Sequence, residues 1–237
     1  MRRDRSADQT DEVAQLSAPV DVLRVRLWGA AIAGLTLIVL VFFVIRIATD
    51  WPHIIGGTTP DDDFAERYVA HPWLTYGHIV PGVIYLLGAP LQLSAGFRTR
   101  HYDLHRRLGR VLLGCALLSG TLALVVGVAF AWGGAVESVA SVVFGLWFLL
   151  SLSLALVAIR ASRVPDHRRW MIRAFAVGIG IATIRIWVGL FTGVQLAILD
   201  TDTFPIRSTF GLAFWLGLGM HVLIGEWWLR RTPALRG

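Results

Sequence analysis

The clearest pattern in the sequence is a series of long apolar runs separated by short polar segments. Each run is long enough to cross a hydrocarbon core about 30 Å thick as an α-helix. Six such runs predict an all-α polytopic membrane protein whose six-transmembrane-helix bundle occupies residues 27–230. The predicted spans are 27–48, 72–96, 108–132, 135–159, 170–198 and 210–229.

The polar segments between these spans are short, with one exception. Residues 1–26 form a polar N-terminal tail, and residues 231–237 form a short C-terminal tail. Residues 49–71 make the longest connection, which is interpreted as a solvated loop because it contains Gly, Pro and a triple Asp at 61–63. The third and fourth predicted spans are joined at Gly133-Gly134, which predicts a tight hairpin turn.

Charged residues are distributed unequally between the two predicted sides of the membrane. Segments 98–110, 160–173 and 230–236 contain thirteen arginines against two acidic residues, Asp103 and Asp166. Across the opposite segments there are two arginines and eight acidic residues: Arg67 and Arg207 against Asp50, Asp61, Asp62, Asp63, Glu66, Glu137, Asp200 and Asp202. Because basic residues accumulate on the cytoplasmic side, both termini are predicted to be cytoplasmic in a multi-pass protein of the inner (plasma) membrane.

Composition supports the membrane assignment and excludes several other classes. The chain is 55% hydrophobic with a mean hydropathy of +0.62, and its 16% of charged residues is well below the about 25% typical of soluble domains. The net charge of +6 does not indicate nucleic-acid binding, because the arginines cluster at the ends of apolar runs, next to the lipid bilayer. The single cysteine, Cys115, excludes an intramolecular disulfide and a multi-cysteine metal site. The oligomeric state is left open.

Two short motifs nearly repeat each other at the start of the third and fifth spans. They are Asp103-Leu104-His105-Arg106-Arg107 and Pro165-Asp166-His167-Arg168-Arg169. Membrane orientation and contact with anionic lipid headgroups account for the arginines. They do not account for a histidine at the same place in both motifs. Neutral imidazoles on neighbouring helices can bind one iron or relay protons, so His105 and His167 are candidate metal ligands.

Polar residues inside the spans are costly and mark candidate sites. His78 in the second span and Arg185 in the fifth lie at similar depth. His78 is either hydrogen-bonded across the bundle or a metal or heme ligand. Arg185 requires an anion or carbonyl groups, for example a heme propionate, a lipid or quinone oxygen, or a substrate carboxylate. His221 lies between Gly217 and Gly225, a pattern that fits either a flat slot for a planar macrocycle or close helix packing by small residues.

Further predictions concern helix ends and pairing. Asp103 and Asp166 precede apolar runs and are predicted to be helix N-caps. Arg173 in the fifth span and Glu226 in the sixth lie at similar depth and are predicted to form a structural ion pair. The sequence lacks G-x-x-x-x-G-K-[ST], G-x-S-x-G and H-E-x-x-H, the motifs of P-loop nucleotide binding, serine hydrolysis and zinc proteolysis.

From His78 to Arg185 the chain resembles a bacterial family of predicted membrane proteins, domain of unknown function 2306. The resemblance rests on His78, Gly88-Ala89-Pro90-Leu91-Gln92, Arg98, His105-Arg106-Arg107-Leu108-Gly109-Arg110, Trp147, His167-Arg168-Arg169-Trp170-Met171-Ile172-Arg173 and Arg185. Because that family is uncharacterised, the resemblance implies a membrane protein and leaves its activity open.

More distantly, the chain is similar to the cytochrome b561-type diheme proteins, which are six-helix bundles with histidines on the middle helices. The resemblance implies that His105 and His167 match the ligand pair between the third and fifth spans. The other pair has no counterpart, because span 135–159 contains no histidine. His78 would therefore need His221, or a residue other than histidine, as its partner.

These observations favour a b-type-heme or quinone-linked protein of membrane electron transfer, with a quinone or another redox protein as partner. His105 and His167 would be axial ligands, His78 and His221 would belong to a second site, and Arg185 would hold a propionate or quinone oxygen. The alternative is a non-redox transporter or small-molecule or lipid-binding protein with a pocket around His78 and Arg185. A third hypothesis is a structural membrane partner whose polar residues only hold the helices together.

Overall fold

The computed structural model describes residues 22–198 and 207–232, and every regular element in these residues is an α-helix. Its helices are α2 (Val22–Gly56), α3 (Asp63–Ala70), α4 (Pro72–Leu93), α5 (Ala95–Arg100), α6 (Tyr102–Ala129), α7 (Gly134–Arg160), α8 (Val164–Ile198) and α9 (Arg207–Arg231). The chain divides by its internal contacts into two units, Met1–Gly34 and Leu35–Gly237. In the first unit, the described residues belong to α2, and from residue 26 on they are exposed except for half-buried Ile32.

Six of these helices are long and apolar enough to cross a membrane, so the predicted fold class is confirmed for the described residues. They are α2 from Arg26 onward, α4, α6, α7, α8, and α9 from Thr209 onward. Large apolar side chains such as Leu118, Val139, Leu146 and Leu223 are more than half exposed on the second unit. A bilayer covers such surfaces, and the protein is therefore a multi-pass membrane protein in contact with lipid.

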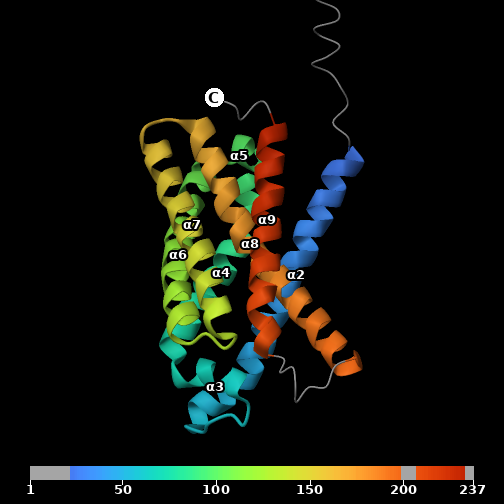
Figure 1. Cartoon of the computed structure of the whole chain (residues 1–237). Coiled ribbons are helices and arrows are strands. Elements are labelled where there is room, and N and C mark those ends of the chain that lie inside the picture. The colour runs from blue at the N-terminus through green and yellow to red at the C-terminus, as the bar shows by residue number, and fades with distance from the viewer. Residues whose placement is uncertain (1–21, 199–206, 233–237) are drawn as a thin grey trace, which may run out of the picture. The chain divides into compact units, whose positions relative to one another are not determined.

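The second unit is built around α8. This helix packs against α4, α7 and α9, while α6 packs against α4 and α7. Many of its most deeply buried positions are small or aliphatic, including Leu152, Ala155, Ala182 and Ala213, which are 0% exposed. The short helices α3 and α5 lie at opposite ends of this bundle (Figure 1). We call these the α3 end and the α5 end.

A tight turn connects α6 to α7, as Gly133-Gly134 predicted. The helix α6 ends at Ala129 and α7 begins at Gly134, whose φ of +67° lies in the left-handed region. Glycine adopts this conformation without the Cβ clash that other residues would meet. The hairpin turn is therefore confirmed.

Several connections are shorter than the sequence patterns indicated. The predicted loop between residues 96 and 108 contains α5 and the first turn of α6, separated only by His101. The Ser94 side chain caps α5 by accepting a hydrogen bond from the Phe97 N–H, at 3.3 Å. The predicted N-caps were wrong: Asp103 and Asp166 lie inside the first turns of α6 and α8, because both helices begin before them.

The segment 49–71 is more ordered than the interpretation as a solvated loop implied. Helix α2 continues to Gly56, and Asp62 caps α3 by accepting from the Phe64 N–H at 3.1 Å. Acidic residues in the first turn and Arg67 in the last turn of α3 complement the helix dipole. The triple Asp that suggested a turn therefore starts a helix.

The ion pair predicted between Arg173 and Glu226 is confirmed. The Arg173 Nε donates to Glu226 Oε1 at 2.5 Å, and Nη2 donates to Oε2 at 3.0 Å. This two-point contact joins α8 to α9, and the Trp170 ring lies 4.5 Å from the guanidinium carbon. The pair is structural, because both charges are satisfied by each other.

Candidate functional site

A cavity of about 230 Å³ lies inside the second unit, between α2, α3, α4, α6, α7, α8 and α9. Most of its wall is aromatic or aliphatic, including Phe42, Ile79, Leu86, Phe144, Phe148 and Phe214. Against this apolar surface stand a few polar side chains, notably His78, Arg185, Arg46, Arg67 and Glu137. A mostly apolar chamber with a few polar groups is the usual form of a small-molecule site.

His78 is held in the cavity wall by Ser119 of α6. The His78 Nδ1 lies 2.9 Å from the Ser119 carbonyl oxygen and 3.1 Å from the Ser119 Oγ. The Ser119 hydroxyl donates a hydrogen bond to the His78 carbonyl oxygen at 2.9 Å. A carbonyl oxygen only accepts hydrogen bonds, so we assign the proton to Nδ1. In the neutral ring Nε2 is then a hydrogen-bond acceptor.

The close approach of α4 to α6 at this point depends on Gly82. A Cβ at position 82 would lie 2.8 Å from Ser119 Oγ, closer than such atoms can approach. Glycine therefore lets Ser119 reach His78, which lies one turn earlier on α4.

Arg185 enters the cavity from α8 near His78. Its guanidinium carbon lies 5.3 Å from the centre of the Phe42 ring, and the charge is close enough to His78 to act on the imidazole electrostatically. Among residues 22–198 and 207–232, no carboxylate forms an ion pair with Arg185. The Arg185 guanidinium therefore lines the cavity next to the aromatic ring of Phe42.

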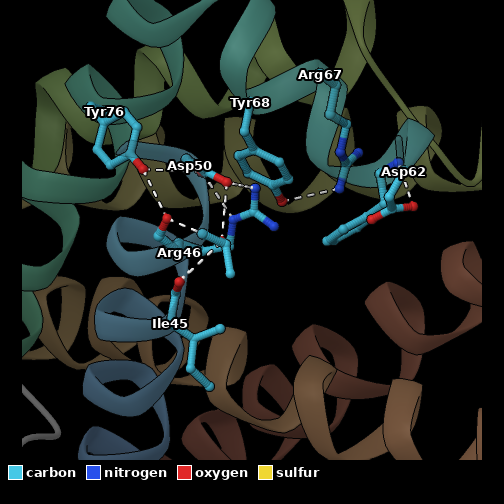
Figure 2. A network of polar contacts seen from close by, with 9 residues as sticks. Ile45, Arg46, Asp50, Asp62, Arg67, Tyr68 and Tyr76 are labelled. Carbon is cyan, nitrogen blue, oxygen red and sulfur yellow. Dashed lines mark hydrogen bonds and ion pairs between the residues drawn. The ribbon is translucent and has the colours of Figure 1, made fainter. Parts of the chain in front are cut away.

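The other two arginines of the cavity wall behave differently. Arg46 binds Asp50 one turn later on α2 through two contacts, one of them Nε to Oδ2 at 3.1 Å. Asp50 is 0% exposed and also accepts from the Tyr76 hydroxyl at 3.0 Å. Figure 2 shows this network, in which the Arg46 guanidinium carbon lies 4.2 Å from the Tyr68 ring centre. The charge of Arg46 is therefore neutralised within the protein.

Arg67 of α3 is paired with Glu137 of α7, at 3.5 Å. It also donates to the Phe130 carbonyl at 3.2 Å and to the Tyr68 hydroxyl at 3.1 Å. Glu137 is 3% exposed, and its other oxygen accepts from the Gly133 N–H at 2.6 Å. Both arginines at the α3 end thus have carboxylate partners, whereas Arg185 has none in the described residues.

The model of DUF2306, described as a predicted membrane protein, matches residues 75–229, which is more than half of the chain. The chain belongs to the DUF2306 family. No curated protein and no solved structure matches it. The matched residues of this DUF2306 protein run from α4 to α9, so they include His78 and Arg185 but not the Arg46–Asp50 pair. The resemblance to cytochrome b561 stays a prediction.

His221 lies outside the cavity, between α8 and α9. Its Nδ1 is 2.9 Å from the Gly217 carbonyl and 3.4 Å from Thr183 Oγ1. A Cβ on Gly217 would come within 2.8 Å of Ile184, and one on Gly225 would lie 3.1 Å from Ala176. These glycines serve close helix packing, as one of the two interpretations predicted. A ligand role for His221 stays a prediction.

The two histidines of the repeated motifs lie in the first turns of α6 and α8. His105 on α6 lies within electrostatic range of His167 on α8 and of Arg98 on α5. The His167 Nδ1 is 3.0 Å from the Ala155 carbonyl. No group of three or more His, Cys, Asp or Glu side chains suited to a metal ion occurs in the described part of the chain. The use of His105 and His167 as a heme-ligand pair therefore stays a prediction.

The sequence analysis missed the two arginine–carboxylate ion pairs at the α3 end. Arg46 and Asp50 carry one available signal, since opposite charges four residues apart face each other on a helix. The partnership of Arg67 with Glu137 has no such signal, because 70 residues separate them in the sequence.

Proposed function

We infer that this membrane protein binds an amphipathic small molecule in the cavity, with an oxygen-bearing head group against Arg185 and His78. The observation that carries this proposal is that Arg185 faces the cavity without a carboxylate partner among the described residues. An arginine inside the membrane requires an anion or a set of oxygen acceptors. A bound head group would supply them.

The two polar side chains select the chemistry of that head group. Arg185 has only donors and therefore binds an oxygen acceptor. Neutral His78 offers an acceptor at Nε2, because Nδ1 is bonded to Ser119. A head group with both an acceptor oxygen and a hydroxyl satisfies both residues. A hydroquinone ring and a protonated carboxylic acid share this chemistry.

The rest of the cavity suits an apolar body. Its aromatic and aliphatic wall offers no further unpaired charge in the described residues, since Arg46 and Arg67 are already neutralised. A quinone in this position would connect the protein to membrane electron transfer, whereas a fatty acid would indicate lipid binding or transport. The head-group chemistry is the same in both cases.

Binding of three probes to the full chain in maltoside micelles tests this function. Reduced decylubiquinone and lauric acid carry the head group on an apolar tail, and dodecane carries the tail alone. We expect Arg185→Gln to weaken binding of one of the first two about ten- to hundredfold, the usual effect of losing a hydrogen bond to a charged group. Arg185→Lys should weaken it less, because the charge is kept.

Arg160→Gln is the matched control, because Arg160 is exposed at the end of α7. It should leave the affinity unchanged. Tighter binding of decylubiquinone than of lauric acid would identify a quinone ligand, and the reverse a fatty acid. The function would be wrong if neither probe bound, if dodecane bound equally well, or if Arg185→Gln and Arg160→Gln had the same effect.

A further inference from the structure

The α5 end carries a second concentration of positive charge, separate from the cavity. Arg98 on α5, His105 on α6, and His167 and Arg168 on α8 come from three helices. Helix α4 packs against α5, α6 and α8, which brings these elements to one end of the bundle, and the charge of Arg98 acts on both His105 and Arg168. We call these four residues together with Gln92 the histidine–arginine cluster.

No carboxylate in the described residues forms an ion pair with Arg98 or Arg168. Asp166, the acid of the second repeated motif, is paired instead with Arg163 at 3.5 Å. Arg98 and Arg168 are both half-buried, so water screens their repulsion less than at a fully exposed surface. Like charges held together in this way require a counter-charge that the described chain does not provide.

Two buried polar atoms of the cluster also have no partner. They are Nε2 of Gln92 and Nδ1 of His105. Gln92 reaches α6 beside Gly109, where a Cβ would lie 3.3 Å from its Oε1, and Gly109 is one helical turn after His105. The two atoms are therefore on neighbouring positions of the same interface. An unsatisfied buried polar atom destabilises the folded protein, so a bound acceptor group would be favourable here.

We propose that the histidine–arginine cluster binds a phosphate group between α4, α5, α6 and α8. Arg98 and Arg168 neutralise its charge, and the Gln92 amide and the His105 imidazole donate hydrogen bonds to its oxygens. A guanidinium pair with additional neutral donors matches the several oxygens of a phosphate. The site is independent of the cavity ligand, because the cavity wall includes none of these five residues.

The phosphate has two possible sources, an anionic lipid headgroup or a soluble phosphate, and calorimetric titration separates them. The full chain in maltoside micelles and phosphate-free buffer is titrated with dioctanoyl-phosphatidylglycerol, dioctanoylglycerol and inorganic phosphate. Tighter binding of phosphatidylglycerol than of inorganic phosphate indicates the lipid. Equal binding of the two indicates the soluble anion. Dioctanoylglycerol, which lacks the phosphate, should not bind at this site.

Variants locate the binding. Arg98→Gln and Arg168→Gln should each weaken phosphate binding about ten- to hundredfold, the range for a charge-assisted hydrogen bond. Arg107→Gln is the matched control, because Arg107 is exposed on α6 within the same motif. Gln92→Glu should abolish binding by placing a carboxylate in the site, and it decides the matter if the arginine variants do not fold.

Four outcomes would overturn the proposal. The first two are that neither phosphate probe binds, or that dioctanoylglycerol binds as well as dioctanoyl-phosphatidylglycerol. The other two are that Arg98→Gln and Arg107→Gln have equal effects, or that Gln92→Glu still binds phosphate. A Soret absorption band that disappears in His105→Ala and in His167→Ala would also overturn it, because a heme would then occupy the cluster.

Discussion

Two groups of arginines, one at each end of the bundle, differ in whether they have a carboxylate partner. At the α3 end, Arg46 and Arg67 each have a buried carboxylate partner, Asp50 and Glu137. At the α5 end, Arg98 and Arg168 have no such partner in the described chain, although the charge of Arg98 acts on Arg168. Paired charges hold helices in place, whereas unpaired charges indicate a ligand. The same residue type therefore predicts stability for Arg46 and Arg67 and ligand binding for Arg98 and Arg168.

This contrast yields predictions for equilibrium unfolding in maltoside–dodecyl sulfate mixed micelles, in phosphate-free buffer. We expect large losses of stability for the ion pairs at the α3 end, a smaller effect for the Arg173–Glu226 pair, and no loss for the unpaired Arg98.

The largest effect is expected for Asp50→Asn. This change leaves Arg46 without its counter-charge next to a position that is 0% exposed. Breaking a buried pair in this way should lower the free energy of unfolding by about 3–5 kcal/mol. Asp61→Asn, at an exposed position, should change it by less than about 0.5 kcal/mol. Equal stability of the two variants would contradict a structural role for the Arg46–Asp50 pair.

A smaller loss is expected for Glu137→Gln. The amide keeps an oxygen that can accept from the Gly133 N–H, but it removes the charge that faces Arg67 at 3.5 Å. The free energy of unfolding should fall by about 1–3 kcal/mol. Glu66→Gln, on the exposed side of α3, is the control and should be neutral. A loss as large as that of Asp50→Asn would show that the two pairs are equivalent.

The Arg173–Glu226 pair should show an intermediate coupling, since its side chains are 14% and 29% exposed. A double-mutant cycle with Arg173→Gln and Glu226→Gln should give an interaction energy of about 1 kcal/mol. Strictly additive effects of the two substitutions would mean that the contact adds no stability.

The smallest effect is expected for Arg98→Gln. Removing one of two neighbouring cations relieves repulsion, so the free energy of unfolding should stay constant or rise by about 0.5 kcal/mol. Addition of dioctanoyl-phosphatidylglycerol should then stabilise the unmodified protein more than the variant, because ligands stabilise the state that binds them. A loss of stability without ligand would show that Arg98 has a partner within the chain.

The membrane helices were predictable because each depends on a local property, the length of an apolar run. The ion pair of Arg173 with Glu226 was also predictable, since position along two antiparallel spans estimates depth. Helix α3 was not, because it has only eight residues, of mixed polarity, and its formation depends on the Asp62 cap. The predicted caps at Asp103 and Asp166 were wrong because polar residues before an apolar run extend the helix here.

The candidate site was predictable only in part. Their positions along the second and fifth spans predicted that His78 and Arg185 lie at the same depth in the membrane. In the structure both line the cavity. The pairing of Arg67 with Glu137 depends on how α3 packs against α7, which no local pattern encodes. The sequence shows where the arginines are, but the tertiary structure decides which of them have a carboxylate partner.

The contact between Gly82 and Ser119 has a mechanical consequence. A methyl group at position 82 would act as a wedge, because it would lie 2.8 Å from Ser119 Oγ. Either the helices α4 and α6 would move apart or Ser119 would rotate, and both changes would disturb the hydrogen bonds to His78. The ¹⁵N chemical shifts of this single imidazole would then report a change in the spacing between two transmembrane helices.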